Sequence, residues 1–371
     1  MNSNPKKNVL VLPGDGIGPE CVDEAIKIIE LLNSKNKTNI EMDHDYVGGS
    51  SFDINKKCIS EKTMQKAKNV DAILFGSVGG PKWSNVPRME RPENGLLKIR
   101  KELDLFANLR PAFTFPSLIN TSSLKANLIS DLDIMIIREL TSGVYFGEPK
   151  EIKIFSDGTK VAIDTQSYTS VEIERVARTA FEIAQKRHGK VCSVEKSNVM
   201  ETGVLWREIV TELHAKHYGK IELTHMLADA CSMELLKRPK QFDTIVTDNL
   251  FGDMLSDQSA MLTGSIGMLP SASLGVQNNG FMHALYEPIH GSAPDIAGKG
   301  LANPIAQILS LGMMLEYSFN LQNEARLIYL SIDNCLKKDL RTPDIAEENS
   351  KILSTKEMGD AILGELNSLI N

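Results

Sequence analysis

Short apolar runs alternate with helical periodicities along the first hundred residues of the chain. The run "NVLVL" (8–12) predicts a buried strand, and "VDAILFGSVGG" (70–80) predicts a second strand that ends in a glycine loop. Between them, "CVDEAIKIIELL" (21–32) has apolar residues three and four apart, which predicts an amphipathic helix. Strands that alternate with helices favour an α/β layered sheet.

The pattern changes in the middle of the chain. Residues 151–165, "EIKIFSDGTKVAIDT", alternate apolar and polar positions on both sides of Asp157-Gly158, which predicts a β-hairpin. Because a lone hairpin is only marginally stable in water, we expect this arm to pack on something, for which a second copy of the chain is a candidate. "FDTIVTD" (242–248) predicts a strand that leads into a helix from Gly252.

The last third is dominated by amphipathic or buried helical patterns at 303–318 and 324–338. The 371 residues contain no repeat and no low-complexity segment, so we expect two interleaved lobes. One lobe is predicted at 1–105 plus 264–371. The other is predicted at 106–263, with the hairpin arm at 151–165.

Composition narrows the class of protein. A net charge of −7 argues against a nucleic-acid or membrane-surface protein, and no apolar run approaches the ~18 residues that span a bilayer. The five cysteines are scattered and never form C-x-x-C, which indicates free thiols in a reducing compartment. We therefore expect a cytoplasmic protein.

The loop "VLPGDGIGPE" (11–20) resembles a dinucleotide-binding turn but fails its test. The Rossmann fingerprint G-x-G-x-x-G needs a third glycine where this chain has Pro19. A nicotinamide cofactor, if bound, must therefore be held by another part of the chain.

Three carboxylates are candidate metal ligands. Asp253 and Asp257 are four residues apart and would share one face of a helix, where their like charges repel unless a cation lies between them. Asp229 is a possible third ligand, and an all-oxygen set suits Mg²⁺ or Mn²⁺ rather than zinc. The spacing alone also fits a solvated acidic face.

Arginines offer a second kind of chemistry, because a guanidinium matches a carboxylate bidentately. Arg100, Arg110 and Arg138 could bind a small polycarboxylate, although each also fits an ordinary surface ion pair. Tyr145 follows the third arginine. Lys196 could act as a base if desolvated, and otherwise is a solvated lysine.

The stretch "YEPIHGSAPDIAGKGLANP" (286–304) is rich in small residues that let a ligand approach the backbone. His290 could stack on or bond to a base, and Asp295 could accept both hydroxyls of a ribose. A glycine-rich connector before a helix explains the same pattern equally well.

Seven blocks, taken in order, resemble one family, the β-decarboxylating dehydrogenases of 2-hydroxy acids, which includes isocitrate and isopropylmalate dehydrogenases. The blocks cover nearly the whole chain: "LPGDGIGPE", "GSVGGPKW", "RPENGLLKIRKELDLFANLRP", "RELTSGVYFGEP", "VEKSNVMETGVLWR", "NLFGDMLSDQSAML" and "EPIHGSAPDIAGKGLANP". The resemblance implies a two-lobed α/β/α layered sandwich that is not a Rossmann fold. One position departs from many relatives: Gln258 stands where they often carry an acid.

The resemblance also implies roles for individual residues. Tyr145 and Lys196 would handle protons, and Asp229, Asp253 and Asp257 would hold Mg²⁺ or Mn²⁺. The substrate would meet Arg100, Arg110, Arg138, Asp229, Glu93, Leu96, Leu97 and Val199. NAD would be held by Gly79, Gly80, Glu287, His290, Gly291, Ser292, Ala293, Pro294, Asp295 and Asn303.

Within the family, the blocks are most similar to members that oxidise and decarboxylate 3-isopropylmalate in leucine biosynthesis. Such enzymes are homodimers in which Lys196 and Asp229 would come from the partner subunit and the hairpin would clasp the dimer. Another malate, such as isocitrate, homoisocitrate or tartrate, is the nearest alternative. A silent regulatory subunit would lack some of these side chains, and no P-loop motif is present.

Overall fold

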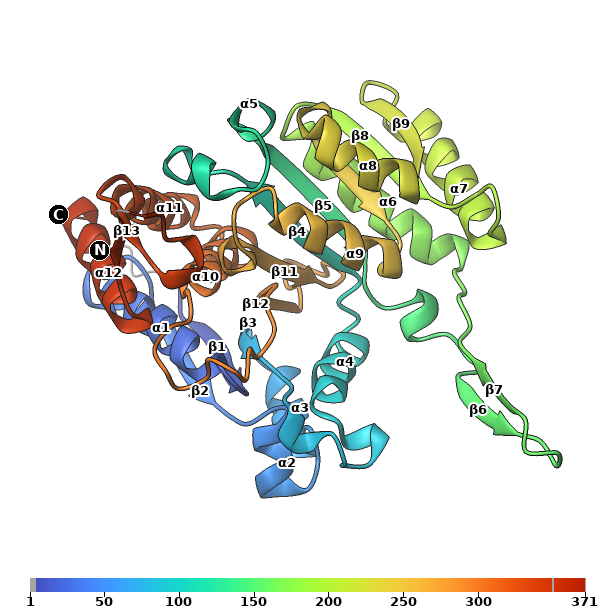
Figure 1. The fold of residues 1–371 in the computed structure, drawn as a ribbon, viewed down its shortest axis with the longest axis horizontal. Helices are drawn as coiled ribbons and strands as arrows, with labels where there is room; N and C mark the ends of the chain where they lie inside the picture. The colour runs from blue at the N-terminus through green and yellow to red at the C-terminus, as the bar shows by residue number, and fades with distance from the viewer. Residues whose placement is uncertain (1–4, 349, 371) are drawn as a thin grey trace. The chain divides into compact units, whose positions relative to one another are not determined.

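The structure, a computed structural model, describes residues 5–348 and 350–370. The chain forms two compact units and passes between them several times (Figure 1). The first unit comprises Met1–Leu105, Thr114–Ala126 and Ala260–Asn371, and the second comprises Phe106–Phe113 and Asn127–Ser259. Each unit therefore combines segments that are distant in sequence.

The first unit is built on a mixed sheet. Its strands lie in the order β2 (Ile40–His44), β1 (Lys7–Gly14), β3 (Ala72–Ser77), β12 (Ala284–Pro288) and β11 (Pro270–Leu274). β1 runs parallel to β2 and β3, β12 runs parallel to β3, and β11 runs antiparallel to β12. Alternate residues of β1 and β3, such as Leu10 and Phe75, point into one core because side chains alternate across a strand.

Helices complete the first unit: α1 (Gly18–Ser34), α2 (Gly49–Asn55), α3 (Glu61–Ala67), α4 (Pro92–Glu102), α10 (Ile305–Tyr317), α11 (Gln322–Lys337) and α12 (Thr355–Ile370). A two-stranded ribbon joins β13 (Leu340–Arg341) to β14 (Lys351–Ile352). α10 is apolar nearly all round and buried along its length, because α1, α11 and strands β11 and β12 surround it.

The sheet strands of the second unit lie in the order β4 (Ala107–Phe113), β5 (Asp133–Glu139), β10 (Thr244–Thr247), β8 (Lys190–Glu195) and β9 (Glu222–Leu227). β4 is antiparallel to β5, and the other neighbours are parallel. The carboxyl ends of β5, β10, β8 and β9 therefore lie at one edge, which is where open α/β sheets bind ligands.

Helices of the second unit are α5 (Ala126–Ile129), α6 (Ser170–Gln185), α7 (Glu201–His217), α8 (Ala228–Lys237) and α9 (Asn249–Ala260). A capping box between Thr169 and Glu172 starts α6. The hairpin of β6 (Glu151–Ile154) and β7 (Lys160–Ile163) extends away from the helices of this unit (Figure 1), and most of its side chains are exposed. Its turn has Gly158 at φ +85°, a conformation that favours glycine.

The predicted strands, helices and hairpin are confirmed, as is the mixed α/β fold class. α9 begins at Asn249, three residues before the predicted start, because Asp248 accepts the Phe251 amide and caps the helix. The two compact units divide the chain differently from the predicted lobes at 114–126 and 260–263, which lie in the first unit. Phe115 stacks on Tyr329 there, and the Ser117 carbonyl accepts from Arg341.

No helix in residues 5–348 and 350–370 is both long enough and apolar enough to cross a membrane.

Candidate active site

Two buried arginines of the second unit converge on one aspartate. Arg110 projects from β4 and Arg138 from the end of β5, where the antiparallel pairing of these strands brings the two side chains close together. Arg110 Nη1 donates to Asp253 Oδ1 at 3.2 Å, and Arg138 Nη1 bonds to the same oxygen. Asp253 comes from the second turn of α9, so the helix start decides where this carboxylate lies.

Tyr145 belongs to the same cluster. It ends the short 3-10 turn Gly143–Tyr145, and its hydroxyl donates to Asp253 Oδ2 at 3.0 Å. The Arg138 guanidinium lies over its ring, 5.5 Å from the centroid. Burial, and then the negative charge of Asp253, raises the pKa of Tyr145, so its phenol holds its proton at neutral pH.

The paired carboxylates on α9 remain open to solvent. The side chain of Asp253 is 33% exposed and that of Asp257 is 56% exposed, and Arg110 Nη1 lies 3.5 Å from Asp257 Oδ1. Partial burial raises the pKa of Asp257, with Asp253 adding to the rise and Arg110 opposing it. Two oxygen ligands on one exposed helix face fit a hard divalent cation.

Lys196 and Asp229 form a separate pair. Lys196 follows β8 and Asp229 lies in the first turn of α8; the Lys196 Nζ donates to Asp229 Oδ1 at 2.5 Å and lowers the pKa of Asp229. Within the described parts of the chain, no three His, Cys, Asp or Glu side chains gather as a metal site. The structure therefore does not bring Asp229 together with Asp253 and Asp257 in one chain.

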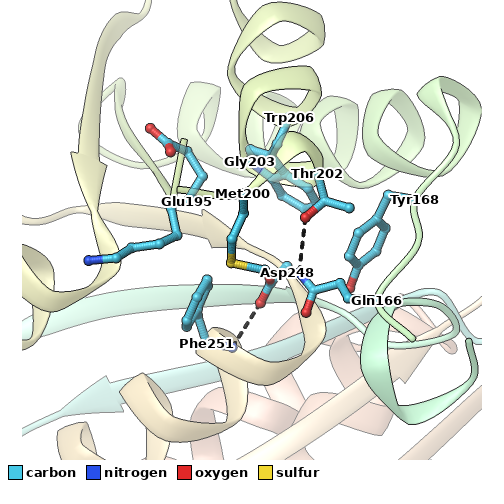
Figure 2. Close-up of a pocket in the computed structure, with 10 residues that line it drawn as sticks. Gln166, Tyr168, Glu195, Met200, Thr202, Gly203, Trp206, Asp248 and Phe251 are labelled. Carbon is cyan, nitrogen blue, oxygen red and sulfur yellow. Dashed lines mark hydrogen bonds between the residues drawn. The ribbon is translucent and has the colours of Figure 1, made fainter. Parts of the chain in front are cut away.

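A cavity with room for about one water molecule lies beside Lys196. Gln166, Thr202, Asp248 and Phe251 line it, as Figure 2 shows. Gln166 donates to Asp248 Oδ2 at 2.9 Å and to Thr202 at 3.3 Å. Burial raises the pKa of Asp248 to about 6.

Arg100, the remaining predicted arginine, lies in the first unit. It leaves the last turn of α4, and its Nη2 donates to Glu287 Oε1 at 2.6 Å. Both side chains are buried, and Arg100 Nε has no hydrogen-bond partner within residues 5–348 and 350–370. Glu287, which we predicted at the cofactor, thus contacts a predicted substrate residue.

The loop from His290 to Asp295 packs on the turn after β1. A Cβ at Gly16 would lie 1.9 Å from the Ser292 carbonyl oxygen, and Gly16 has φ +60°, so only glycine fits there. Gly16, the second glycine of the failed fingerprint, thus lies directly against this loop. Gly79 lies beside Glu93 and Ser292.

Two residues near this loop differ in what they offer to a ligand. His290 is buried, and its Nε2 has no hydrogen-bond partner among residues 5–348 and 350–370. Because Nδ1 donates to the Gly291 carbonyl, the neutral imidazole offers Nε2 as an acceptor to a ligand donor. Asn303 donates to Asp344 and accepts from the Ile305 amide at the start of α10. Its side chain is therefore used within the first unit. The loop His290–Asp295 also contains Gly291, Ala293 and Pro294, and Gly80 follows Gly79 in the loop after β3.

The residues predicted to contact the side chain of the substrate have different surroundings in the structure. Leu96 is partly buried against the core of the first unit, whereas Leu97 is half-buried on the turn between Glu93 and Arg100. Val199 lies in the second unit near Lys196, and its side chain is 72% exposed. Gln258 bonds to Ser232 on α8, away from the carboxylate pair.

Sequence reasoning missed three polar residues of the cluster: Asn108, Asn249 and Ser256. The spacing of each residue along the sequence could have predicted its place in the cluster. Asn108 and Arg110 are two apart on a strand and so share a face. Asn249, Asp253 and Ser256 follow each other at helical spacing.

The chain is similar to known proteins over nearly its whole length. The family model described as isocitrate/isopropylmalate dehydrogenase matches residues 8–362. 3-Isopropylmalate dehydrogenase of Rhizobium meliloti (strain 1021) is 58% identical over 98% of this chain and 99% of that protein. The enzyme of the same name from Pelagibacter ubique (strain HTCC1062) is 56% identical over 97% and 98%. The crystal structure of isocitrate dehydrogenase from Methylococcus capsulatus has 32% identity and a TM-score of 0.85, covering 97% of this chain and 99% of that one.

Proposed function

Because this chain belongs to the isocitrate/isopropylmalate dehydrogenase family, we propose that it catalyses the NAD-dependent oxidative decarboxylation of 3-isopropylmalate to 4-methyl-2-oxopentanoate and CO₂ in leucine biosynthesis. The observation that carries the proposal is the cluster of Arg110, Arg138, Tyr145 and Asp253, in which two buried guanidinium groups and a protonated phenol surround one carboxylate.

The arginines would bind the carboxylates of the malate. Arg110 and Arg138 are buried, and their positive charges face the exposed side of α9. Arg100 would also bind a carboxylate of the substrate. A buried guanidinium binds a carboxylate more strongly than an exposed one, because less water competes for its donors.

Asp253 and Asp257, with Asp229, would hold a divalent cation. When bound, the cation would supply Lewis-acid activation of the substrate hydroxyl and stabilisation of the enolate, and NAD⁺ would accept the hydride. The oxygen-only donor set supports Mg²⁺ or Mn²⁺ over zinc.

Lys196 and Tyr145 would move protons in opposite directions. Lys196, hydrogen-bonded to Asp229, would take the proton of the C2 hydroxyl as the substrate is oxidised. Tyr145, whose raised pKa keeps its phenol protonated, would give a proton to the enol left after CO₂ departs. Val199 would line the substrate site beside Lys196.

NAD would lie along the loop His290–Asp295, with Gly79 and Gly80 at the nicotinamide end. The buried Nε2 of His290, which has no hydrogen-bond partner in the part of the chain that the structure describes, supports this assignment, because the amino group of adenine can donate to it. Since the side chain of Asn303 is engaged with Asp344, Asn303 would contribute main-chain groups.

We also propose a cytoplasmic homodimer with shared active sites. Large apolar side chains are exposed on the hairpin and on helices α7 to α9: Ile152, Ile154, Val161, Val204, Met233, Leu236 and Met254. Exposed apolar patches of this kind favour association. A partner's Lys196–Asp229 pair could then meet the Asp253–Asp257 face. All five cysteines are free and buried, as suits a reducing compartment.

The test is NADH formation on a panel of 3-substituted malates, with and without EDTA. We expect 3-isopropylmalate to give the highest kcat/KM and EDTA to abolish the activity. Isocitrate as the better substrate, or undiminished activity in EDTA, would contradict the proposal.

A further inference from the structure

Each of the two buried arginines in the second unit is held at its Nε atom by a fully buried asparagine. Arg110 Nε donates to Asn108 Oδ1 at 2.7 Å. Arg138 donates to Asn249 Oδ1 twice, from Nε at 2.9 Å and from Nη2 at 2.7 Å. Asn108 and Asn249 are both 0% exposed. We propose that these asparagines are positioning residues that aim the two guanidinium groups at the substrate carboxylates, an inference that rests on the proposed function.

The neutral charge of the asparagine amide matters as much as its position beside the arginine. An amide oxygen fixes the plane of a guanidinium group without adding negative charge, so the arginine keeps its attraction for an anionic ligand. The first unit offers a contrast, because Arg100 is held by the carboxylate of Glu287. With Nε fixed by the amide, the Nη1 atoms of Arg110 and Arg138 are turned toward Asp253, on the open face of α9.

Asn249 also donates hydrogen bonds, which an ionised carboxylate could not do. Its Nδ2 donates to the carbonyl of Leu140 at 3.2 Å and to the carbonyl of Ser142 at 2.8 Å. Those residues lead directly into the turn that carries Tyr145. As the first residue of α9, Asn249 therefore ties the arginine, the tyrosine-bearing turn and the acidic helix to one buried amide group.

The experiment uses the isosteric variants Asn108→Asp and Asn249→Asp. Each variant keeps an oxygen acceptor for its arginine and adds a buried negative charge beside it. We expect both to raise the KM for 3-isopropylmalate by at least about tenfold, the loss typical of a disturbed charged hydrogen bond. The KM for NAD⁺ should stay within about twofold of wild type. Calorimetric binding of 3-isopropylmalate without NAD⁺ should weaken in parallel.

Asn249→Asp should also lower kcat, because its new oxygen faces two carbonyls and loosens the turn before Tyr145. Asn108→Ser, which stays neutral, should weaken substrate binding less than Asn108→Asp. The matched control is Asn33→Asp in the first unit, where the asparagine bonds to the backbone of Ile40 and to Thr38 and, among the described residues, makes no hydrogen bond to an arginine. This control should leave both KM values unchanged.

The outcomes separate this inference from the proposed function. A wild-type enzyme that oxidises no malate would refute the function itself. An active wild type whose Asp variants lose only thermal stability, with an unchanged KM for 3-isopropylmalate, would overturn the positioning role. An equal rise in both KM values would overturn it too. If one variant fails to fold, the other decides, because the two asparagines hold different arginines.

Discussion

At the scale of single residues, Asp253 is the most connected group of the candidate site. It accepts hydrogen bonds from Arg110, Arg138 and Tyr145, whereas Asp257 meets only the distant edge of Arg110 among the contacts described above. The two carboxylates were predicted from one spacing rule, yet their surroundings differ. Their substitutions should therefore have different consequences.

Asp253→Asn should lower turnover and weaken Mn²⁺ activation by at least about tenfold, because it removes a proposed ligand and also disturbs both arginines and Tyr145. Asp257→Asn, the matched variant, should weaken Mn²⁺ activation with less effect on the KM for substrate. Titration of activity against Mn²⁺ gives both quantities. Unchanged metal dependence in Asp253→Asn would remove it from the ligand set.

Asp295 is exposed at the end of the proposed cofactor loop. If it accepts both ribose hydroxyls, a 2′-phosphate would bring like charges together, so NAD⁺ should be preferred over NADP⁺ by orders of magnitude. In Asp295→Ala this preference should shrink, mainly through a higher KM for NAD⁺. The ratio of kcat/KM for the two cofactors measures it, and a ratio near one in the wild type would rule out this role.

At the scale of elements, the local pattern predicted most of the secondary structure. Alternation and three-to-four spacing depend on neighbours in sequence, so β1, α1, β3, the hairpin and β10 all followed from them. Partnerships between elements were harder to predict. Asn108 and Arg110 share a strand and could have been paired, but Asn249 and Arg138 are 111 positions apart. Only the sheet order of β5 beside β10 brings them together.

We expect two neighbouring leucines of α4 to have different roles, Leu96 in the packing of the core and Leu97 in the binding of substrate. Because Leu96 packs on the core, Leu96→Ala should mainly lower the melting temperature. Leu97→Ala should instead raise the KM for 3-isopropylmalate, by up to about thirtyfold if the whole isopropyl contact of about 2 kcal/mol is lost. Steady-state kinetics and thermal unfolding of both variants distinguish these effects, and identical behaviour of the two would contradict the division.

The last residue of β5, Glu139, is a buried acid that makes stability depend on pH. Glu139 accepts from the amide and hydroxyl of Thr141 and from the amide of Ser142, and Arg175 lies nearby on α6. Burial nevertheless raises the pKa of Glu139 to about 7. The folded state therefore binds this proton more tightly than the unfolded chain does, and its contribution to stability is lost as pH rises toward 7.

We expect the free energy of unfolding of wild type, minus that of Glu139→Gln, to fall between about pH 5 and pH 7 and to level off above pH 8. Taking the difference cancels the pH dependence of the other titrating groups, and any constant penalty of the glutamine shifts the curve without changing its slope. Urea unfolding across this range is the measurement. A difference that stays flat, or that grows with pH, would show that the carboxylate is ionised in the folded protein.

At the scale of the whole molecule, the resemblance of seven sequence blocks predicted more than periodicity could. It gave the family, which the comparisons confirm, and it named side chains from both units. It did not predict the roles of the buried asparagines Asn108 and Asn249, because a resemblance of sequence blocks identifies reactive groups and not the residues that orient them. Nor did it place 114–126 in the first unit, where Phe115 stacks on Tyr329 and the Ser117 carbonyl accepts from Arg341.

Shared active sites predict complementation between two inactive enzymes. Lys196→Met and Tyr145→Phe should each lack activity as homodimers. If Lys196 serves the partner's site, mixed dimers from co-expression contain one intact site and should recover activity. Tagged purification of the mixed dimer followed by NADH formation tests this. An inactive mixed dimer would indicate that each chain completes its own site.

The interleaved path of the chain sets an order for its biosynthesis. The second unit is complete once Ser259 has left the ribosome, whereas the first unit still lacks β11, β12 and α10 at that moment. The early strands and helices of the first unit cannot complete their core until about residue 317, the end of α10, has emerged. Until then, the apolar surfaces that α10 later covers remain exposed to solvent. The first part of the chain to be made is therefore among the last to finish folding, and it is the part for which we expect nascent chains to need chaperone protection.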